Sequence, residues 1–234
     1  MTILYYLPFQ EKHAILFHRS PKNRIFVKHM QYLNLRQQLK DFLVFSLNDI
    51  RKIEPSFHRQ RLNEWQNKGY IRKVVNEHYI FSDPDIDETA LFFIANSIYK
   101  PSYISLESAL SYYGLIPEAV YAVTSVASRT TRSFHSELAN FTYRKIKPNL
   151  LFGYRLISRD GHNFKMAEAE KALLDYFYLN PRLKTAGDFE ELRINKEIFR
   201  EQTNIEKMKD YLKLFGNIAL EKRACKFLNF MDDA

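Results

Sequence analysis

The spacing of hydrophobic residues changes at Gly69, in the middle of the segment SFHRQRLNEWQNKGYIRKVVNEHYIF that covers residues 56–81. Before Gly69, the apolar side chains Phe57, Leu62 and Trp65 recur at the spacing of a buried helical face. After Gly69, the stretches YIRKVV and HYIF alternate or are rich in β-branched residues, which is typical of strands. The pattern therefore predicts a helix that ends at Gly69 and a short hairpin that follows it.

Two more helices are predicted upstream of this one. Apolar residues at helical spacing over residues 26–39 predict the first. In FSLNDIRKIEP, Ser46 is suited to cap the second helix and Pro55 to end it, and Ser56 is suited to cap the third. Three helices followed by a hairpin predict that residues 1–83 form a winged helix-turn-helix DNA-binding domain with an N-terminal extension.

The stretch SDPDIDET, around Pro84, predicts a domain boundary. Beyond it, the helical patterns ALFFIANSIY, SLESALSYYGLI and AEAEKALLDYFYLN are mixed with the strand patterns AVYAVTSVAS, NFTYRKIK and YRLIS, and further helices follow. Residues 84–234 are therefore predicted to form an α+β domain with a helical tail, and the whole chain an α+β protein. The alternating Asp83, Asp85 and Asp87 indicate a linker or helix start, because the glycine and final glutamate of a calcium loop are absent.

Charge is distributed unevenly between the two predicted domains. The 234-residue chain carries a net charge of +8. Residues 1–83 hold 14 Lys and Arg against 7 Asp and Glu, whereas residues 84–234 hold 21 against 20. A concentrated basic segment attracts a polyanion by electrostatic steering and counterion release. Double-stranded DNA is therefore the expected partner of the first domain.

Donor chemistry predicts which side chains of the first domain contact DNA. Arg59 suits bidentate hydrogen bonding to guanine, and Gln60 and Asn63 suit adenine, while the other cations and hydroxyls suit phosphate. The predicted contacts are Ser56, His58, Arg59, Gln60 and Asn63 on the third helix, and Arg72, Lys73 and His78 on the hairpin. The alternative is that this polar face is only solvated or binds a protein.

A second basic patch is predicted in the second domain. It combines the segment TSVASRTTR, residues 124–132, with a basic strand that follows in the sequence. Its cations are Arg129, Arg132, Arg144 and Lys145. Hydroxyls beside cations suit a phosphate group of DNA or of a nucleotide, so we expect an auxiliary contact with the DNA backbone. Solvated strand ends are the alternative interpretation.

Other polar residues of the second domain are interpreted as structural. Of the serines in PSYISLESALSYYGL, Ser102 or Ser105 is expected to cap a helix. In AEAEKALLDYFY, Lys171 and Asp175 are four residues apart, which supports a helix by an ordinary ion pair. Glu170 and Lys171 are therefore expected to have an architectural role and not a catalytic one.

Motifs of catalysis and cofactor binding are absent from the sequence, which has no Walker-type glycine loop, no GxGxxG, no HExxH and no GxSxG. We therefore expect no enzyme, with no catalytic residues, no cofactor and no metal site. Cys225 is the single cysteine, which fits a reducing cytosol. The N-terminus lacks the features of a secretory signal, and no stretch of about 18 to 20 apolar residues occurs, so a cytoplasmic protein without a membrane partner is expected.

Three segments of the second domain are distinctive. They are PSYISLESALSYYGLIPEAVYAVTSVASRTTRSF, NFTYRKIKPNLLFGYRLI and AEAEKALLDYFYL. These segments resemble the AbiEi family of antitoxins from bacterial abortive-infection toxin-antitoxin systems, and the winged helix upstream matches the arrangement of that family. The resemblance covers roughly residues 40–180. The segment before Ser46 is longer than the minimal winged helix of the family, and the final part of the chain carries no family signature.

The resemblance implies a protein with two roles in phage defence. The N-terminal domain represses its own operon by binding the promoter, where two copies are expected to read inverted repeats. The C-terminal domain counteracts a nucleotidyltransferase-like toxin of a type IV system, and no stable complex with the toxin is assumed. From the residues alone, two other classes stay open: an enzyme or phosphate-ligand-binding protein that uses residues 124–132, and a winged-helix adaptor that binds protein.

Overall fold

The computed structural model describes residues 32–117, 122–159 and 161–232. The chain divides into two units between Asp41 and Phe42. In the first unit, residues 32–38 are helical, which confirms the end of the first predicted helix. The start of that helix and the N-terminal extension lie outside the described residues. The domain boundary predicted after residue 83 is a different division and stays a prediction.

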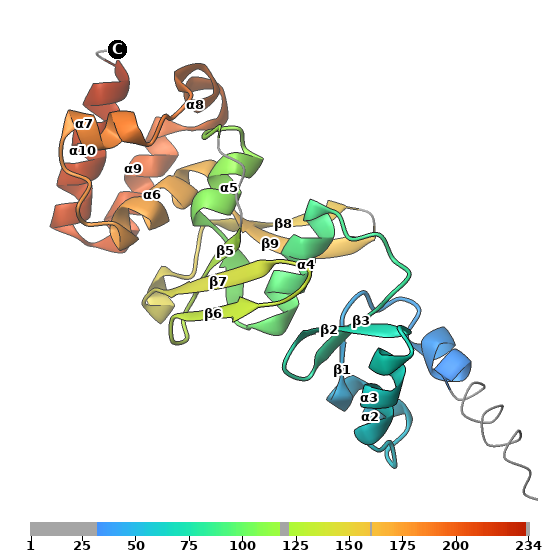
Figure 1. The fold of residues 1–234 in the computed structure, drawn as a ribbon. Coiled ribbons are helices and arrows are strands. Elements are labelled where there is room, and N and C mark those ends of the chain that lie inside the picture. Colours follow the sequence, from blue (N-terminus) through green and yellow to red (C-terminus); the bar gives the residue numbers. More distant parts are fainter. Residues whose placement is uncertain (1–31, 118–121, 160, 233–234) are drawn as a thin grey trace, which may run out of the picture. The chain divides into compact units, whose positions relative to one another are not determined.

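The second unit begins with two short helices and a hairpin. In chain order the elements are β1 (Phe45–Ser46), α2 (Leu47–Ile53), α3 (Gln60–Asn67), β2 (Ile71–Val75) and β3 (His78–Phe81). The strands form an antiparallel sheet in the order β1-β3-β2 (Figure 1). Ser46 caps α2 by a capping box with Asp49, as its position predicted. Gly69 follows α3 with a φ of 69°, which confirms the predicted left-handed stop.

The third helix starts later than predicted. Ser56 was expected to cap it, but α3 begins at Gln60, and the residue at its N-cap position is Arg59, whose side chain makes no capping bond. The chain forms a turn at Pro55 and Ser56, closed by a hydrogen bond from the Phe57 amide to the Glu54 carbonyl. This turn buries the Phe57 ring, 5.4 Å from the Trp65 ring. Burial of an aromatic side chain therefore outweighs the local preference of serine for a cap.

A six-stranded mixed sheet forms the centre of residues 84–234. Its strands are β4 (Ser102–Ile104), β5 (Ala122–Ala127), β6 (Arg132–His135), β7 (Asn140–Lys145), β8 (Tyr154–Arg159) and β9 (His162–Ala167). Their order in the sheet is β6-β7-β5-β4-β9-β8. The pairs β5–β7 and β4–β9 are parallel, and the others are antiparallel. The α+β class is confirmed, although β4, β6 and β9 were not predicted.

Helices cover both faces of this sheet. They are α4 (Glu88–Ile98), α5 (Leu106–Tyr112) and α6 (Ala169–Leu179). On one face, Phe164 packs against Phe92 of α4, and the Tyr143 hydroxyl donates to the Ala95 carbonyl. On the other face, Tyr103 of β4 reaches Asp175 of α6. Asp87 caps α4 by accepting a hydrogen bond from the Ala90 amide, in line with the helix start expected from the aspartate cluster.

Four further helices form the predicted helical tail. They are α7 (Ala186–Glu191), α8 (Lys196–Gln202), α9 (Ile205–Phe215) and α10 (Ile218–Asp232), and they gather beside α6 (Figure 1). The buried ring of Phe227 in α10 lies 4.9 to 5.5 Å from the rings of Phe177, Phe189 and Phe199, one each from α6, α7 and α8. Within the described residues, none of the helices is long and apolar enough to span a membrane.

Candidate nucleic-acid interface

Helix α3 has one buried face and one exposed polar face. Leu62 and Trp65 are buried. Gln60, Asn63 and Asn67 are exposed, and their spacing of three and four residues places them along one side of the helix. No acidic side chain stands in the first turn of α3. The first turn therefore presents amide groups to solvent, at the end of the helix whose free N–H groups favour anions.

Arg61 fixes the start of α3 and is not part of the exposed face. Its Nη1 donates to Glu54 Oε1 at 2.7 Å, and its guanidinium lies 4.4 Å from the centroid of the Phe57 ring and 5.3 Å from that of Trp65. The ion pair and the two aromatic contacts hold this side chain inward. The basic residue that remains exposed at this end of the helix is Arg59.

The predicted contacts of the third helix lie in its first turn or just before it. Those residues are Ser56, His58, Arg59, Gln60 and Asn63, and all five are exposed. Ser56, His58 and Arg59 precede α3, and Gln60 and Asn63 occupy its first turn. Their exposed groups are two amides, a hydroxyl, an imidazole and a guanidinium. These five residues will be called the α3 polar face.

The hairpin does not place its three predicted contacts on one face. In the strand register, Arg72 is opposite Ile80 and Lys73 is opposite Tyr79. Because side chains of a strand alternate, Arg72 shares a face with His78, while Lys73 lies on the other face. Lys73 is exposed, whereas Arg72 is half-buried and its Nε is a buried atom without a hydrogen-bond partner in the described part of the chain. Lys73 is therefore the more accessible cation of the hairpin.

The second basic patch is also divided. Arg129 lies over the Tyr99 ring at 4.8 Å, Arg132 is opposite Tyr143 in the sheet, and Lys145 shares the Tyr143 face. Arg144 points to the opposite face, where its Nη2 donates to the Leu179 carbonyl at 3.2 Å. The structure thus brings Arg129, Arg132 and Lys145 to the same face of the sheet and separates Arg144 from them.

Two hydroxyls of the segment 124–132 do not belong to that surface. Thr124 and Ser125 are buried in β5, and the Thr124 hydroxyl donates to the Ser105 carbonyl at 2.8 Å. The Ser108 amide donates to Thr124 Oγ1, and the Thr124 amide donates to Ser108 Oγ. These reciprocal hydrogen bonds hold α5 against β5. The Thr124 hydroxyl already donates its hydrogen to Ser105, so it has no hydrogen left to donate to a phosphate.

A buried ion pair lies between α6 and β4. Lys171 and Asp175 are both fully buried, and the Lys171 ammonium donates to the Asp175 carboxylate. The same carboxylate accepts hydrogen bonds from the Tyr103 and Ser105 hydroxyls, each at 2.9 Å. Ser105 occupies the N-cap position of α5, as predicted, but its hydroxyl bonds to Asp175 and not to the helix. The predicted ion pair and its architectural role agree with this geometry.

The surroundings of Lys171 are aromatic. Its Nζ donates to the Tyr103 hydroxyl at 2.7 Å and lies 4.9 Å and 4.7 Å from the ring centroids of Phe152 and Phe215. Burial lowers the pKa of Lys171 and raises that of Asp175, and this outweighs their mutual attraction. With no exposed surface on either side chain, the pair is positioned to hold helix and strand together and not to meet a substrate.

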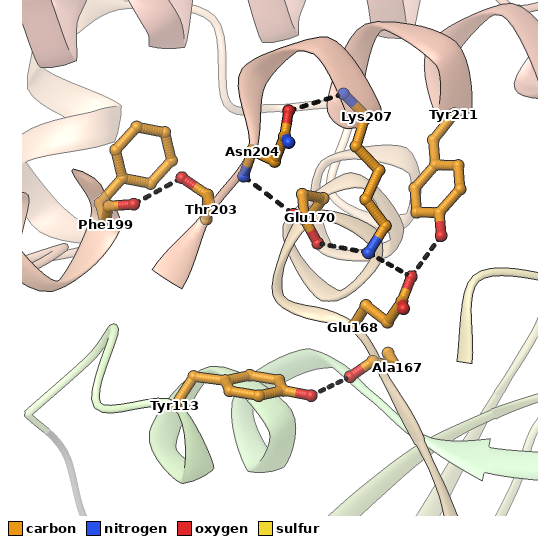
Figure 2. A network of polar contacts seen from close by, with 9 residues as sticks. All are labelled: Tyr113, Ala167, Glu168, Glu170, Phe199, Thr203, Asn204, Lys207 and Tyr211. Atoms are coloured by element: carbon orange, nitrogen blue, oxygen red, sulfur yellow. Dashed lines mark hydrogen bonds and ion pairs between the residues drawn. The ribbon is translucent and has the colours of Figure 1, made fainter. Parts of the chain in front are cut away.

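A second polar network joins the start of α6 to α9 (Figure 2). Lys207 Nζ lies 2.9 Å from Glu168 and 3.7 Å from Glu170, and the Tyr211 hydroxyl donates to Glu168. Glu170 also accepts a hydrogen bond from the Asn204 amide at 2.9 Å. Glu170 thus anchors the N-terminal end of α9, which is the architectural role predicted for it.

The pKa of Glu168 is set by competing effects. Burial is the largest single effect and opposes its ionisation, but the hydrogen bonds from Tyr211 and Lys207 and the positive charges of Lys207 and Arg155 together outweigh it and lower the pKa below the ordinary value. Burial and the bond to Glu168 raise the pKa of Tyr211. Within the described residues, no cluster of His, Cys, Asp or Glu is arranged to hold a metal ion. The networks around α6 join it to β4 and α9, and the α3 polar face is taken as the candidate site.

Sequence reasoning missed Tyr103 and Ser105 as partners of Asp175. These residues are separated from Asp175 by 72 and 70 positions, and only the fold brings them together. The sequence does offer one indication, which is the serine-rich segment at the start of α5. A helix cap uses only one hydroxyl, so the additional serines there suggest other hydrogen-bond partners. Comparison with known proteins adds no assignment, since no protein-family model and no curated protein matches this sequence.

Proposed function

We propose that the protein is a DNA-binding transcriptional repressor of its own operon, with residues 1–83 forming a winged helix-turn-helix with an N-terminal extension. The α3 polar face enters the major groove, and the hairpin contacts the adjacent backbone. In this proposal Arg59 reads guanine, and Gln60 and Asn63 read adenine. Two copies bind the inverted repeats of the promoter.

The observation that carries the proposal is the α3 polar face itself. Its residues are exposed around the first turn of a helix whose other side is buried through Leu62 and Trp65. The order of β1, α2, α3 and the β2–β3 hairpin is that of a reading helix followed by a wing. Residues 1–83 also carry 14 Lys and Arg against 7 Asp and Glu, which favours a polyanionic partner.

The hairpin contributes mainly through Lys73. This side chain is exposed, whereas the half-buried Arg72 shares a face with His78. We expect Lys73→Ala to weaken binding to all DNA sequences alike and to reduce the salt dependence, because a phosphate contact carries no sequence information. Arg72→Ala should have the smaller effect, and the opposite ranking would remove Lys73 from the backbone contact.

Asparagines at the two ends of α3 allow a matched test of base reading. Asn63→Ala should weaken binding to the promoter by about 5- to 150-fold, the range for loss of a bidentate base contact, and should leave binding to unrelated DNA unchanged. Asn67→Ala is the control, because Asn67 is also exposed but stands at the far end of the helix. Fluorescence anisotropy with labelled duplexes measures both. Equal losses in the two variants would contradict groove entry by the first turn.

The antitoxin role rests on the resemblance of the second domain to the AbiEi family. We propose that residues 84–234 counteract a nucleotidyltransferase-like toxin encoded beside this gene. The test is co-expression with the neighbouring gene, measured as growth. Asn63→Ala should relieve repression and still protect the cells, because the two roles belong to different domains. Growth arrest of the host despite co-expression of the unaltered protein would contradict the antitoxin role.

A further inference from the structure

Strand β8 ends the six-stranded sheet with a free edge. It pairs with β9 on one side, and among the described residues no strand pairs with its other side. Five of its six residues are exposed and one is half-buried. A strand in this position presents unpaired backbone N–H and C=O groups, which another extended chain can join.

The two faces of β8 differ in chemistry. Tyr154, Leu156 and Ser158 share one face, where Leu156 is 62% exposed and Tyr154 is 37% exposed. Arg155 and Arg159 share the other face, with Ile157 between them. An incoming strand therefore meets an apolar position on one side and two cations, four residues apart, on the other.

The two strands of the hairpin carry charged side chains of one sign. The charged side chains of β8 and β9 are Arg155, Arg159 and Lys165, all of them cations. Asp160, in the connection between the strands, is the single acid there in the sequence. Glu168, which follows β9, is bonded to Lys207 and Tyr211, and the charge of Arg155 adds to the lowering of its pKa. Arg155 itself lies 5.4 Å from the centroid of the Tyr113 ring. The edge is therefore complementary to an acidic strand.

A second copy of this chain does not suit the same edge. If two β8 strands paired antiparallel about Ile157, Arg155 of each copy would lie opposite Arg159 of the other. Like charges directly opposite each other destabilise a strand pair. Opposite charges at those positions stabilise it, so the charge pattern selects a different partner.

We propose that the free edge of β8 binds an acidic, extended segment of another protein by strand addition. The bound segment carries acidic residues opposite Arg155 and Arg159, and a hydrophobic residue opposite Leu156. Backbone hydrogen bonds supply affinity, and the two arginines supply selectivity. This inference does not depend on DNA binding by the first domain.

A short synthetic peptide tests the proposal with the full chain. The probe is a blocked, fluorescent peptide with the core Glu-Leu-Thr-Leu-Glu, which presents the same pattern in either direction along β8. We expect saturable binding below about 1 mM. The same peptide with alternate backbone amides methylated should not bind, and neither should a Lys-Leu-Thr-Leu-Lys peptide. Equal binding of the methylated or the lysine peptide would overturn strand addition.

Charge reversal locates the site. Arg159→Glu should lower the affinity for the acidic peptide at least about fivefold and raise the affinity for the lysine peptide, because the charge at this position changes sign. Lys222→Glu is the matched control, since it makes the same charge change at an exposed position of α10. Leu156→Ser should also weaken binding, and circular dichroism checks that the variants are folded. Equal effects of Arg159→Glu and Lys222→Glu would contradict a site at β8.

Two other results would assign the edge to a different partner and overturn the proposal. Sedimentation could reveal a dimer that Leu156→Ser dissociates, in which case a second copy occupies β8. Alternatively, Arg159→Glu could lower the affinity for DNA and leave the peptide affinity unchanged. The cations of the hairpin would then belong to a nucleic-acid surface.

Discussion

At the scale of single residues, the Lys171–Asp175 pair requires the burial of two charged groups. Both charges are fully buried, and each is offset by the other and by the hydroxyls of Tyr103 and Ser105. Taking ions out of water is expensive, and the cost is recovered only when every remaining donor and acceptor is satisfied. The pair therefore specifies how α6 meets β4 more than it adds to stability.

Removing one partner of this pair should be far worse than removing both. Lys171→Met leaves a buried carboxylate unpaired and should lower the free energy of unfolding by about 3 to 5 kcal/mol. The double variant Lys171→Met, Asp175→Leu should recover most of this loss. Denaturant unfolding measures all three proteins. Lys213→Met is the control, because the Lys213–Asp210 pair is exposed and its loss should change little. A double variant less stable than Lys171→Met would contradict this account.

The Glu168 network makes stability depend on acid. Its lowered pKa means that the folded state holds the carboxylate more strongly than the unfolded chain, whose ordinary value is 4.5. This contribution is fully present above that value and is lost as the pH falls through the folded-state pKa. The difference in unfolding free energy between wild type and Glu168→Gln should therefore be largest near about pH 7 and shrink by about pH 3.5. A difference that stays constant over this range would contradict the role of the charge.

At the scale of elements, two glycines with positive φ lie in surroundings that differ in the space left for a side chain. Comparing them distinguishes the cost of a left-handed backbone from the cost of steric crowding. Gly69, after α3, and Gly153, before β8, have φ values of 69° and 67°. A Cβ on Gly69 meets no atom within 4 Å, whereas on Gly153 it would lie 3.0 Å from the Tyr211 ring and 3.1 Å from the Lys171 stem. The two sites therefore share the strain of an L-residue and differ in available space.

Alanine substitution at these glycines should reveal the difference. Gly69→Ala should cost about 1 to 2 kcal/mol of stability from the left-handed conformation alone. Gly153→Ala should cost about 1 to 3 kcal/mol more, because it crowds both the Tyr211 and the Lys171 networks. Thermal unfolding of the two variants is the measurement. Equal losses of stability in the two variants would contradict this expectation, because they would show that the Tyr211 and Lys171 side chains can move aside without loss of stability.

The sequence predicted correctly those features that depend only on residues close together in the chain. The cap at Ser46 and the stop at Gly69 were predicted correctly because each depends on a few neighbouring residues. The edge strand β6 shows the limit. It is short and polar, and it was missed because only its pairing with β7 defines it. The start of α3 was misplaced because burial of Phe57 is a tertiary effect.

The candidate site was predictable in part for the same reason. The exposed residues of the α3 polar face follow from helical spacing, which is visible in sequence. Separation of Arg72 from Lys73, and of Arg144 from the other cations of its patch, depends on strand alternation and register. Alternation within a strand already separates neighbours such as Arg72 and Lys73, but register is set by pairing, so sequence could not show which cations of different strands share a face.

At the scale of the whole molecule, positive charge is concentrated in two regions. Residues 1–83 carry a net charge of +7, from 14 Lys and Arg against 7 Asp and Glu, and residues 122–167 hold eight Lys and Arg against two Asp and Glu. The proposed functions assign the first region to DNA, and part of the second to an acidic partner strand. If they act separately, Arg159→Glu should leave promoter affinity unchanged while Lys73→Ala lowers it.

The most direct test of DNA binding compares the purified full chain on its own upstream promoter fragment and on an unrelated fragment of equal length, at about 50 and 200 mM salt. The account predicts that the promoter is bound about a thousandfold more tightly than the unrelated fragment, and that both affinities fall as salt rises. Equal affinity for the two fragments, or no binding to either, would contradict the assignment of the α3 polar face to a DNA groove.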